Sequence, residues 1–548
     1  MTGAELIVQT LKAHGVEHIA VLCGNGLNAL LQACNDAPLR LIDVRNEQSA
    51  AYIADVWGAM TGRLGVVAVS AGPGHTNALT GVTNAWWDGR PMLLISGCSE
   101  AETRGLGHFQ ELNQIAMAAP VTKYARLIER PEQLAPELRK AIHAALSGRP
   151  GPVHLTITLD VMGGESPESV PSAHPTPQRA APCAAPDPGL VAQAAEMLQS
   201  ARKPAIVAGS GCFYARAGAE MKQVASATDI PLFSLMWDRC CIDECWPQYV
   251  GPTTAECNGA FPLLAQADVI LTLGGRADFR LGYGLPPVCA PDARFIRVDI
   301  EPGETVLGPA DLPIVADPRS FLAALLPHLD EMPKRSDWLQ AMHAARAAFV
   351  GVWDERLCEM ETPVPALCVI RALKPFLDRD VTFLLDGGNI GRWAHMMLWD
   401  RHPAFWQTCG ASGVIGWGLA GAISAKLARP DHPVLLLVGD GSAGFTLADI
   451  ETALRHGTPY VAVVASDAAW GIVAECFGED CRRGSELGEI RFDKVAEGFG
   501  ARGVYIENGA QLAPAIEEAI GLNTVTFIHV PIQLGGIAAV AEKIGCAP

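Results

Sequence analysis

The fold is indicated most clearly by residues 434–472, which read VLLLVGDGSAGFTLADIETALRHGTPYVAVVASDAAWGI. An apolar run of strand length ends at Gly439, a helical pattern starts near Thr446, and a second apolar run ends at Asp467. Strand, helix and strand in this order are typical of a parallel sheet, because parallel strands need a crossover that is usually a helix. The segment therefore predicts an α/β fold.

The same alternation of strand and helix patterns continues along the whole chain. Strand-like runs include HIAVLCG, LGVVAVSAG, PMLLISG, KPAIVAGSG, ADVILTLGGR, ARFIRVDI, VTFLLDGG and TVTFIHVPI. From about Gly163 to Pro188 the sequence is rich in Pro, Ser and Ala without periodicity, which predicts a linker. A charged helical connector, MPKRSDWLQAMHAARAAFVGVWDERL, precedes the last block. We therefore expect three doubly wound parallel-sheet domains, at residues 1–165, 186–328 and 363–548.

Length and charge narrow the class of function. A chain of 548 residues is too long for one hydrophobic core. Its net charge of −18 argues against nucleic acid or an anionic membrane as the main partner. The sequence contains neither an N-terminal basic segment followed by an apolar run nor an apolar stretch long enough to cross a membrane. We expect a cytoplasmic protein that acts on small molecules.

Two acidic residues follow neighbouring strand patterns in residues 434–472. Asp440 ends one strand and Asp467 ends the next, which places two oxygen ligands side by side at a crevice. The backbone N–H groups of Ser442 and Ala443 can face an anion such as a diphosphate. Two carboxylates, a backbone carbonyl and phosphate oxygens suit octahedral Mg²⁺. The alternative is a Gly-Asp-Gly turn at a strand end that binds no ligand.

This segment resembles the Mg²⁺ and coenzyme motif of thiamine-diphosphate-dependent enzymes, in particular the acetolactate synthase, benzaldehyde lyase and 2-hydroxyacyl-CoA lyase group. The resemblance implies that Asp440, Asp467 and the carbonyl of Ala469 hold the metal. Position 467 departs from the family pattern, which has Asn there, so an additional negative charge would lie beside an anionic diphosphate. The flanking residues implied to contact the coenzyme are Gly439, Gly441, Ser442, Ala443, Trp470 and Gly471.

A second segment, LRLIDVRNEQSAAYIADVWGAMTG at residues 39–62, resembles the part of the family that carries its activating glutamate. The match identifies Glu47. A buried carboxylic acid against N1′ of the aminopyrimidine favours the imino tautomer, whose nitrogen removes the thiazolium C2 proton. Taken alone, Glu47 would more often be an exposed acid in the first turn of a helix.

The segments SAGPGHTNALTGVTNAWWDGRPMLLISG and HFQELNQIAMAAPVTKYARLI, at residues 70–97 and 108–128, are also similar to this group. The resemblance implies that four residues border the thiazolium, namely Pro73, Asn77, Phe109 and Gln110, and that Gln110 also contacts substrate or intermediate oxygens. Gln110 could instead be an ordinary capping or core amide. His75 is either a substrate-facing acid/base or a packing histidine.

The third block supplies two further matches. LLDGGNIGRWAHMM places Gly388, Asn389 and Ile390 where relatives contact the diphosphate. CGASGVIGWGLAGAISAKLA resembles the segment that bends the coenzyme, with the Gly413 carbonyl accepting from its 4′-amino group and Ile415 between its rings. A Gly-rich helix start packed on a sheet would explain these glycines equally well, but not their coincidence with the other motifs.

The resemblance covers nearly the whole chain and implies a pyrimidine-binding, a central and a diphosphate-binding domain. The implied reaction makes or breaks a carbon–carbon bond next to a carbonyl, in a 2-keto acid, aldehyde, 2-hydroxy ketone or acyl-CoA. The site would lie between subunits of a homodimer or homotetramer. An alternative, motivated by Asp467, is a catalytically idle relative that keeps the fold for binding or assembly.

The central domain offers weaker signals. The GSG at residues 209–211 lacks the third glycine of a dinucleotide fingerprint. GGRADFRLGYG, at residues 274–284, loosely resembles the ADP-binding loop of the CoA lyases. The ligand of the central domain therefore has two alternatives, FAD as in the synthases and an ADP or CoA moiety.

Overall fold

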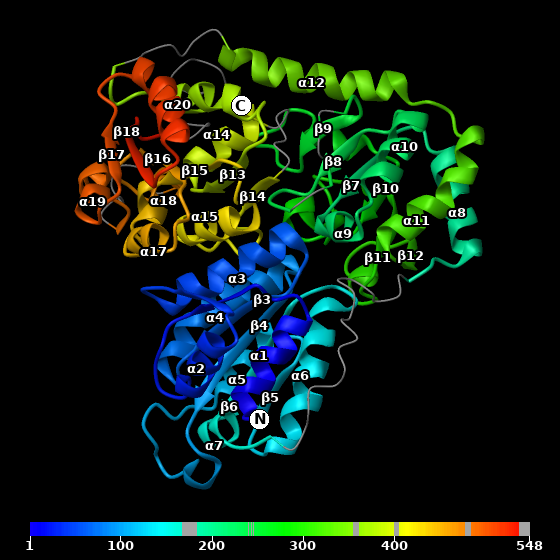
Figure 1. The fold of residues 1–548 in the computed structure, drawn as a ribbon. Coiled ribbons are helices and arrows are strands. Elements are labelled where there is room, and N and C mark those ends of the chain that lie inside the picture. Colours follow the sequence, from blue (N-terminus) through cyan, green and yellow to red (C-terminus); the bar gives the residue numbers. More distant parts are fainter. Residues whose placement is uncertain are drawn as a thin grey trace.

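The computed structural model describes residues 1–166, 184–238, 241–242, 244, 246–354, 361–398, 405–476 and 484–535. These residues form three six-stranded sheets in which neighbouring strands run parallel, with helices on both faces (Figure 1). The predicted α/β class with doubly wound parallel sheets is confirmed. Most of the predicted linker, residues 167–183, lies outside the described residues.

The first domain has the strand order β2-β1-β3-β4-β6-β5. Its strands are β1 (His18–Val21), β2 (Arg40–Asp43), β3 (Gly65–Val69), β4 (Met92–Cys98), β5 (Ala125–Ile128) and β6 (Pro152–Thr158). Helices α1 (Gly3–Ala13), α2 (Asn28–Asp36) and α6 (Pro131–Leu146) pack on one face. Helices α3 (Glu47–Thr61) and α4 (Pro73–Asp88) pack on the other, and α5 (Gln114–Ala118) and α7 (Leu159–Gly163) are short.

The third domain repeats this topology, with the order β14-β13-β15-β16-β18-β17. Its strands are β13 (Thr382–Asp386), β14 (Phe405–Thr408), β15 (Val434–Gly439), β16 (Val461–Ser466), β17 (Arg502–Tyr505) and β18 (Thr526–Pro531). Helices α13 (Ala366–Leu373), α14 (Asn389–Met397) and α20 (Leu512–Leu522) cover one face. The other face carries α15 (Trp417–Ala428), α17 (Asp449–Arg455) and α19 (Phe492–Gly498), while α16 (Asp440–Ala443) and α18 (Gly471–Cys476) follow strand ends.

The central domain has a different order, β12-β11-β10-β7-β8-β9. Its strands are β7 (Pro204–Ala208), β8 (Leu232–Ser234), β9 (Tyr249–Pro252), β10 (Val269–Leu273), β11 (Arg294–Asp299) and β12 (Leu312–Val315). Its helices are α8 (Pro188–Ser200), α9 (Ser210–Ala215), α10 (Gly218–Thr228) and α11 (Pro318–Leu325). Counted from β7, this is the strand order of dinucleotide-binding domains. The predicted connector forms α12 (Ser336–Asp354), which runs across both upper domains (Figure 1).

The strand patterns quoted from the sequence correspond to strands of the structure, whereas short strands such as β5, β8, β14 and β17 carried no recognised pattern. The helix expected near Thr446 is α17, which starts three residues later, and the sequence did not predict the short helix α16 before it. The chain turns into α16 directly at Asp440, where the Gly444 N–H donates to the Asp440 carbonyl at 3.0 Å, and α17 starts only at Asp449.

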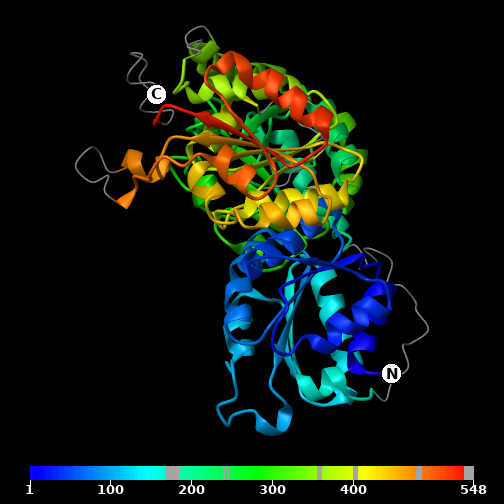
Figure 2. The same cartoon turned by 60° about the vertical axis from the view of Figure 1, so that its left-hand side comes forward.

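The first and third domains share one hydrophobic core. All of α3 except Gln48 and Thr61 is buried, between α4 of its own domain and α15 of the third domain (Figures 1 and 2). A Cβ on Gly421 of α15 would lie 3.2 Å from Val56 Cγ2, and the Ser424 hydroxyl donates to the Ile53 carbonyl at 2.8 Å. Small residues thus let the two helices approach closely.

A buried ion network crosses the same contact. Arg90 Nη1 lies 2.5 Å from Asp55 Oδ2 and Nη2 lies 2.6 Å from Asp88 Oδ2, with each side chain at most 4% exposed. Trp417 Nε1 of α15 donates to Asp55 Oδ2 at 2.9 Å, and Arg90 Nη2 donates to the Thr408 carbonyl at 3.1 Å. The Arg90 guanidinium therefore pairs with two buried carboxylates and also bonds to the third domain.

A second buried polar cluster lies inside the first domain. His75 is fully buried, and its Nδ1 lies 2.9 Å from Ser96 Oγ. His154 Nε2 lies 3.2 Å from the same hydroxyl, and the two imidazole rings are 4.7 Å apart. Burial lowers the pKa of His75 to about 4, and burial next to His75 also lowers the pKa of His154. Both rings are therefore neutral near pH 7.

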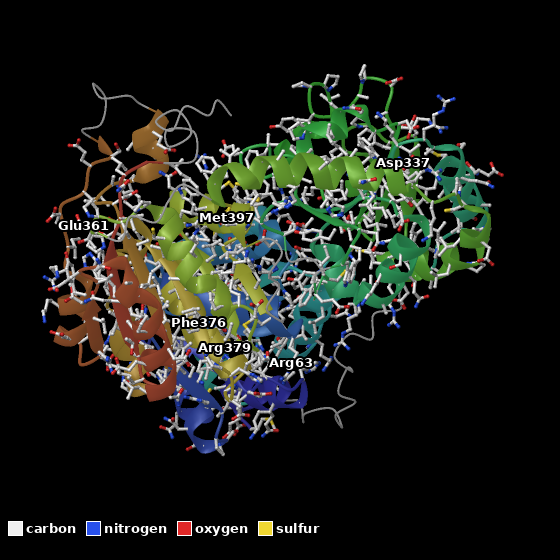
Figure 3. All side chains as sticks on the ribbon, turned by 90° about the horizontal axis from the view of Figure 1, so that it is seen from above. Arg63, Asp337, Glu361, Phe376, Arg379 and Met397 are labelled. Carbon is white, nitrogen blue, oxygen red and sulfur yellow. The ribbon has the colours of Figure 1, made fainter. Side chains whose placement is uncertain are left out.

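Replacing Arg90 by Met should destabilise the protein by about 3–5 kcal/mol, because two buried carboxylates lose their counter-charge. Urea unfolding followed by tryptophan fluorescence measures the loss. The control is Arg379→Ala, which removes an exposed pair with Glu517 next to Phe376 (Figure 3) and should cost about 1 kcal/mol or less. An equal loss of unfolding free energy in the two variants would contradict the role of Arg90 as the counter-charge of two buried carboxylates.

Acidification should destabilise the protein through His75. Its folded pKa of about 4 lies below the value of 6.5 that is usual for a histidine in an unfolded chain, so the unfolded chain takes up the proton first. The stability contribution is complete above about pH 6.5 and is lost as the pH falls towards 4, by on the order of 3 kcal/mol. His75→Gln should reduce the pH dependence of urea unfolding between pH 7 and 4.5. An unchanged dependence would show that His75 does not contribute to it.

Candidate active site

The carboxyl ends of the neighbouring strands β13, β15 and β16 bring three glycine-containing turns together. A Cβ on Gly387 would lie 3.0 Å from the backbone nitrogen of Gly439, so the turns after β13 and β15 touch. A Cβ on Gly471 would lie 2.5 Å from Asp467 Oδ2 and 2.7 Å from Asn389 Nδ2, so the turn after β16 joins them. Side chains at these glycines would fill the space between the turns.

Asp440 lies in the turn after β15, beside the turn after β16, and is 6% exposed. Its Oδ1 accepts from the Gly441 N–H at 2.8 Å, and its Oδ2 accepts from Ser466 Oγ at 3.0 Å and the Ala468 N–H at 2.7 Å. Burial raises the pKa of Asp440, against the effect of these hydrogen bonds. A cation would relieve the cost of this buried charge.

Asp467 adds a second acid beside the first. Burial, followed by the charge of Asp440, raises its pKa to about 7, and its Oδ1 accepts from the Ala469 N–H at 3.2 Å. Asn389, at the start of α14, is 6% exposed, and both atoms of its amide lack a hydrogen-bond partner among the described residues. An unpartnered buried amide is costly unless a ligand completes it.

These groups fit Mg²⁺ and a diphosphate. Mg²⁺ is usually held by one or two carboxylates together with substrate phosphates. This suits a pair of acids, since the described residues contain no group of three or more His, Cys, Asp or Glu side chains that could hold a metal ion without other ligands. The other residues predicted to contact the coenzyme in the third domain occupy the same turns or follow them directly: Gly388, Ile390, Gly439, Gly441, Ser442, Ala443, Ala469, Trp470 and Gly471. Ala443 offers only backbone groups, because its side chain belongs to the core.

An open cavity of about 620 Å³ adjoins these turns. Gly388, Gly413 and Ile415 lie on its wall. Gly413 has a φ of 67° and open space around its Cβ position, and Ile415 is 36% exposed. The Tyr52 hydroxyl of α3 donates to the Ile415 carbonyl at 3.2 Å, which connects this wall to the first domain. The structure thus places Gly413 and Ile415 next to the predicted diphosphate residues.

Glu47 is the first residue of α3 and is 7% exposed. Its Oε2 accepts from Asn77 Nδ2 of α4 at 3.0 Å, and a Cβ on Gly74 would lie 3.1 Å from its Oε1. Pro73, the first residue of α4, belongs to the same turn. Glu47 is not among the residues that line the cavity. That a second copy of the chain completes the site stays a prediction.

Gln110 lies in the loop after β4 with a φ of 62°, and its Oε1 is buried without a partner among the described residues. The adjacent Phe109 is 72% exposed. Gln114, which the sequence did not single out, fixes the base of this loop. Its Oε1 accepts from the Gly72 N–H at 2.9 Å, and its Nε2 donates to the Gly97 carbonyl at 3.1 Å. No sequence pattern marks such a contact.

His75 does not line the cavity and lies in the interior cluster with Ser96. This placement favours the packing alternative over the acid/base role. Asp386 is a further residue that the sequence analysis missed. It ends β13, is 1% exposed and accepts from the Gly418 N–H at 2.7 Å, and burial raises its pKa to about 6. Its position in VTFLLDGG, next to the predicted Gly388, could have identified it.

A second crevice lies between β7 and β10, where the strand order of the central sheet reverses. A Cβ on Gly209 would lie 2.5 Å from the Gly274 carbonyl oxygen, so the turns after these two strands pack closely. Arg276, Asp299 and Glu304 line the crevice, and burial raises the pKa of Asp299 to about 6. Such switch points commonly bind nucleotides. The choice between FAD and an ADP or CoA moiety stays a prediction.

Three family domains match successive parts of the chain. The thiamine pyrophosphate enzyme N-terminal TPP binding domain matches residues 1–117, the central domain residues 191–325 and the C-terminal TPP binding domain residues 386–530. In the described part of the chain, every helix is too short or too polar to span a membrane.

Curated relatives are similar over nearly the full length. The chain is 29% identical to 2-hydroxyacyl-CoA lyase 2 of Bos taurus, over 94% of this chain and 87% of the relative. It is 28% identical to a probable acetolactate synthase of Mycobacterium bovis and to the acetolactate synthase large subunit of Haemophilus influenzae, in each case over 97% of this chain and 95% of the relative. With all three family domains in order and the predicted site residues at the ends of adjacent strands, the chain belongs to the thiamine-diphosphate-dependent enzymes.

Proposed function

We propose that this protein is a thiamine-diphosphate- and Mg²⁺-dependent lyase or carboligase that cleaves or forms a carbon–carbon bond next to a carbonyl. The observation that carries the proposal is the meeting of Asp440, Asp467 and the unpartnered Asn389 amide at three strand ends, directly beside an open cavity. Substrates of this class include 2-keto acids, aldehydes, 2-hydroxy ketones and acyl-CoA thioesters.

The residues of the third domain would hold the coenzyme. Asp440, Asp467 and the Ala469 carbonyl would bind Mg²⁺, and Gly388 and Asn389 would bind the diphosphate. Bound thiamine diphosphate supplies an electron sink for the carbon that loses its bond.

The residues of the first domain would act from the other side of the site. Glu47 would share a proton with N1′ of the pyrimidine, and its position is fixed by Asn77. Gln110 would donate to a developing oxyanion through its side-chain amide. These roles require a second copy of the chain, as a homodimer or homotetramer, and we expect the assembly to be cytoplasmic.

The relatives have two different names, acetolactate synthase and 2-hydroxyacyl-CoA lyase, so their names support either reaction for this chain. The central crevice, which lies at a nucleotide-type switch point, favours an adenine-containing ligand there, either FAD or the ADP part of CoA.

The direct experiment is to add thiamine diphosphate and Mg²⁺ and record near-ultraviolet circular dichroism. Turnover is then measured with pyruvate, benzoin and a 2-hydroxyacyl-CoA. We expect new dichroism bands and aldehyde or carboligation products. Loss of both signals in the intact protein would favour the idle relative that binds or assembles without catalysis.

Glu47→Gln should abolish exchange of the thiazolium C2 proton of bound coenzyme, because the amide cannot share a proton with N1′. Deuterium exchange followed by NMR measures the rate, and circular dichroism confirms binding and folding. Glu132→Gln is a matched control, since Glu132 is also a first-turn acid, on α6. Wild-type exchange in Glu47→Gln would remove Glu47 from the mechanism.

Asp467→Asn should stabilise the ligand-free protein by on the order of 1 kcal/mol, because it removes a like charge beside Asp440. It should also tighten thiamine diphosphate binding at saturating Mg²⁺. Asp440→Asn is the contrasting variant. It should lower both the stability of the ligand-free protein and its affinity for thiamine diphosphate, since the Asp440 carboxylate accepts three hydrogen bonds. Thermal unfolding and coenzyme titration test the pair. A destabilised Asp467→Asn protein would contradict the electrostatic argument.

A further inference from the structure

The cavity beside Gly413 and Ile415 has a second wall, which comes from the central domain. The large apolar side chains of this second wall are Met236, Trp237, Phe261, Phe279 and Val288. Met236 and Phe261 are buried, whereas Phe279 is 47% exposed. The Trp237 and Phe279 rings lie 6.1 Å apart. An exposed aromatic side chain in a cavity offers apolar area that a ligand can cover.

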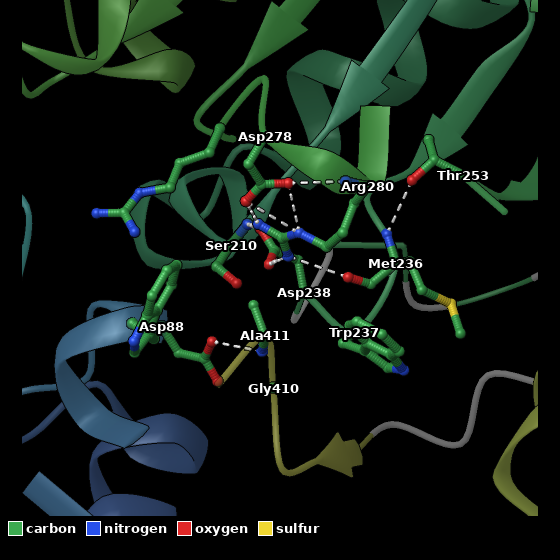
Figure 4. A network of polar contacts seen from close by, with 12 residues as sticks. Asp88, Ser210, Met236, Trp237, Asp238, Thr253, Asp278, Arg280, Gly410 and Ala411 are labelled. Carbon is green, nitrogen blue, oxygen red and sulfur yellow. Dashed lines mark hydrogen bonds and ion pairs between the residues drawn. The ribbon is translucent and has the colours of Figure 1, made fainter. Parts of the chain in front are cut away.

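Polar contacts hold the backbone of Trp237 and of its neighbour Met236, and Figure 4 shows those of Met236. Trp237 has a φ of 66°, which is strained for a bulky residue, and its carbonyl accepts from Thr408 Oγ1 of the third domain at 3.0 Å. The neighbouring Met236 N–H donates to Thr253 Oγ1 at 3.1 Å. Strain of this kind persists where the surrounding structure holds the residue in place, and it is frequent at ligand sites.

Arg280, on the same wall, is paired with two carboxylates (Figure 4). Its Nη1 lies 2.5 Å from Asp238 Oδ1, and its Nη2 lies 2.8 Å from Asp278 Oδ2. Nη1 also donates to the Met236 carbonyl at 3.0 Å, and the residue is only 7% exposed. Because two carboxylates balance its charge and it is almost completely buried, this arginine positions the wall and is not a free cation for a substrate carboxylate.

Among the described residues that line the cavity, the other charged side chains do not supply a free cation. Arg392 is paired with Glu256 at 3.0 Å and with Glu475 at 3.5 Å. Burial lowers the pKa of His395 to about 4, so this ring is neutral at pH 7. Around the part of the cavity that the structure describes, each arginine thus faces two carboxylates, and Asp386 adds a further acid. An anionic substrate would meet an excess of negative charge.

We infer that the cavity selects an uncharged substrate with an aromatic or similarly bulky apolar substituent, which packs on Trp237 and Phe279, and that it disfavours the carboxylate of a 2-keto acid. The inference rests on the proposed function for the identity of the reaction, while the selectivity of the cavity can be measured without turnover.

The binding test uses four small probes in the presence of thiamine diphosphate and Mg²⁺: benzamide, benzoate, acetamide and acetate. Benzamide and acetamide are neutral, whereas benzoate and acetate are anions, and only benzamide and benzoate carry a phenyl ring. Ligand-observed NMR measures the affinity of each probe. Benzamide should bind at least about tenfold more tightly than benzoate or acetamide. Equal or tighter binding of benzoate or acetamide would overturn the inference.

Two variants assign the selectivity to residues. Phe279→Ala should remove most of the preference for benzamide over acetamide, whereas Tyr283→Ala should not. Tyr283 is the matched control, because it lies in the same segment, Phe279–Gly284, is 58% exposed and does not line the cavity. In Asp278→Asn, the side-chain oxygen can still accept from the Arg280 backbone N–H, but one negative charge beside the Arg280 guanidinium is lost. This variant should therefore bind benzoate roughly tenfold more tightly. Unchanged affinities in both variants would overturn the assignment.

The turnover test compares benzoin, acetoin, benzoylformate and pyruvate by kcat/KM. One benzoin gives two benzaldehydes and one acetoin two acetaldehydes, whereas the keto acids give one aldehyde and CO₂. We expect benzoin to be preferred, and a higher kcat/KM for pyruvate or benzoylformate than for benzoin would overturn the inference while leaving the proposed function intact. Absence of coenzyme bands and of all turnover would instead overturn the proposed function, and the four-probe result would still decide the selectivity.

Discussion

The burial of α3 on nearly all sides is the constraint on which the rest of the structure depends. A helix that is apolar all round must be covered on both sides, and here α4 covers one side and α15 the other. The first and third domains are therefore joined by a common core. Gly421 and Ser424 on α15 allow the close approach that this core requires.

The buried charges of Asp55, Asp88 and Arg90 between the first and third domains are paired, so they do not disturb the apolar packing around α3. Asp55 would be a costly isolated charge in the middle of α3, but Arg90, Asn84 and Trp417 all bond to its Oδ2. The same Arg90 holds Asp88, which reaches the backbone of Ala411 in the third domain (Figure 4). The network fixes the segment that leads to Gly413 and Ile415, and thus one wall of the cavity.

The candidate site combines two electrostatic environments. At the strand ends, Asp440 and Asp467 concentrate negative charge where a divalent cation would be held. In the cavity, the charges of Arg280 and Arg392 are balanced by carboxylates, and the central domain contributes aromatic surface. The first environment suits an anionic coenzyme with its metal, and the second suits the neutral part of a substrate.

The amino-acid sequence by itself determined the α/β class and the positions of Asp440 and Asp467 at the ends of two neighbouring strands. Strand periodicity and a turn that carries Asp or Gly are local properties, and parallel strands end at the same edge of a sheet. The family motifs likewise located Glu47 and Asn77, which the structure joins by a hydrogen bond.

Only the tertiary structure decided which side chains face the cavity. His75 and Phe109 come from matching segments, yet one is fully buried beside Ser96 and the other is 72% exposed. The contacts of Gln114 and the paired state of Arg280 also depend on partners distant in the chain. Periodicity reports the side of an element on which a residue lies, whereas burial, pairing and charge balance follow from contacts between elements that no local pattern encodes.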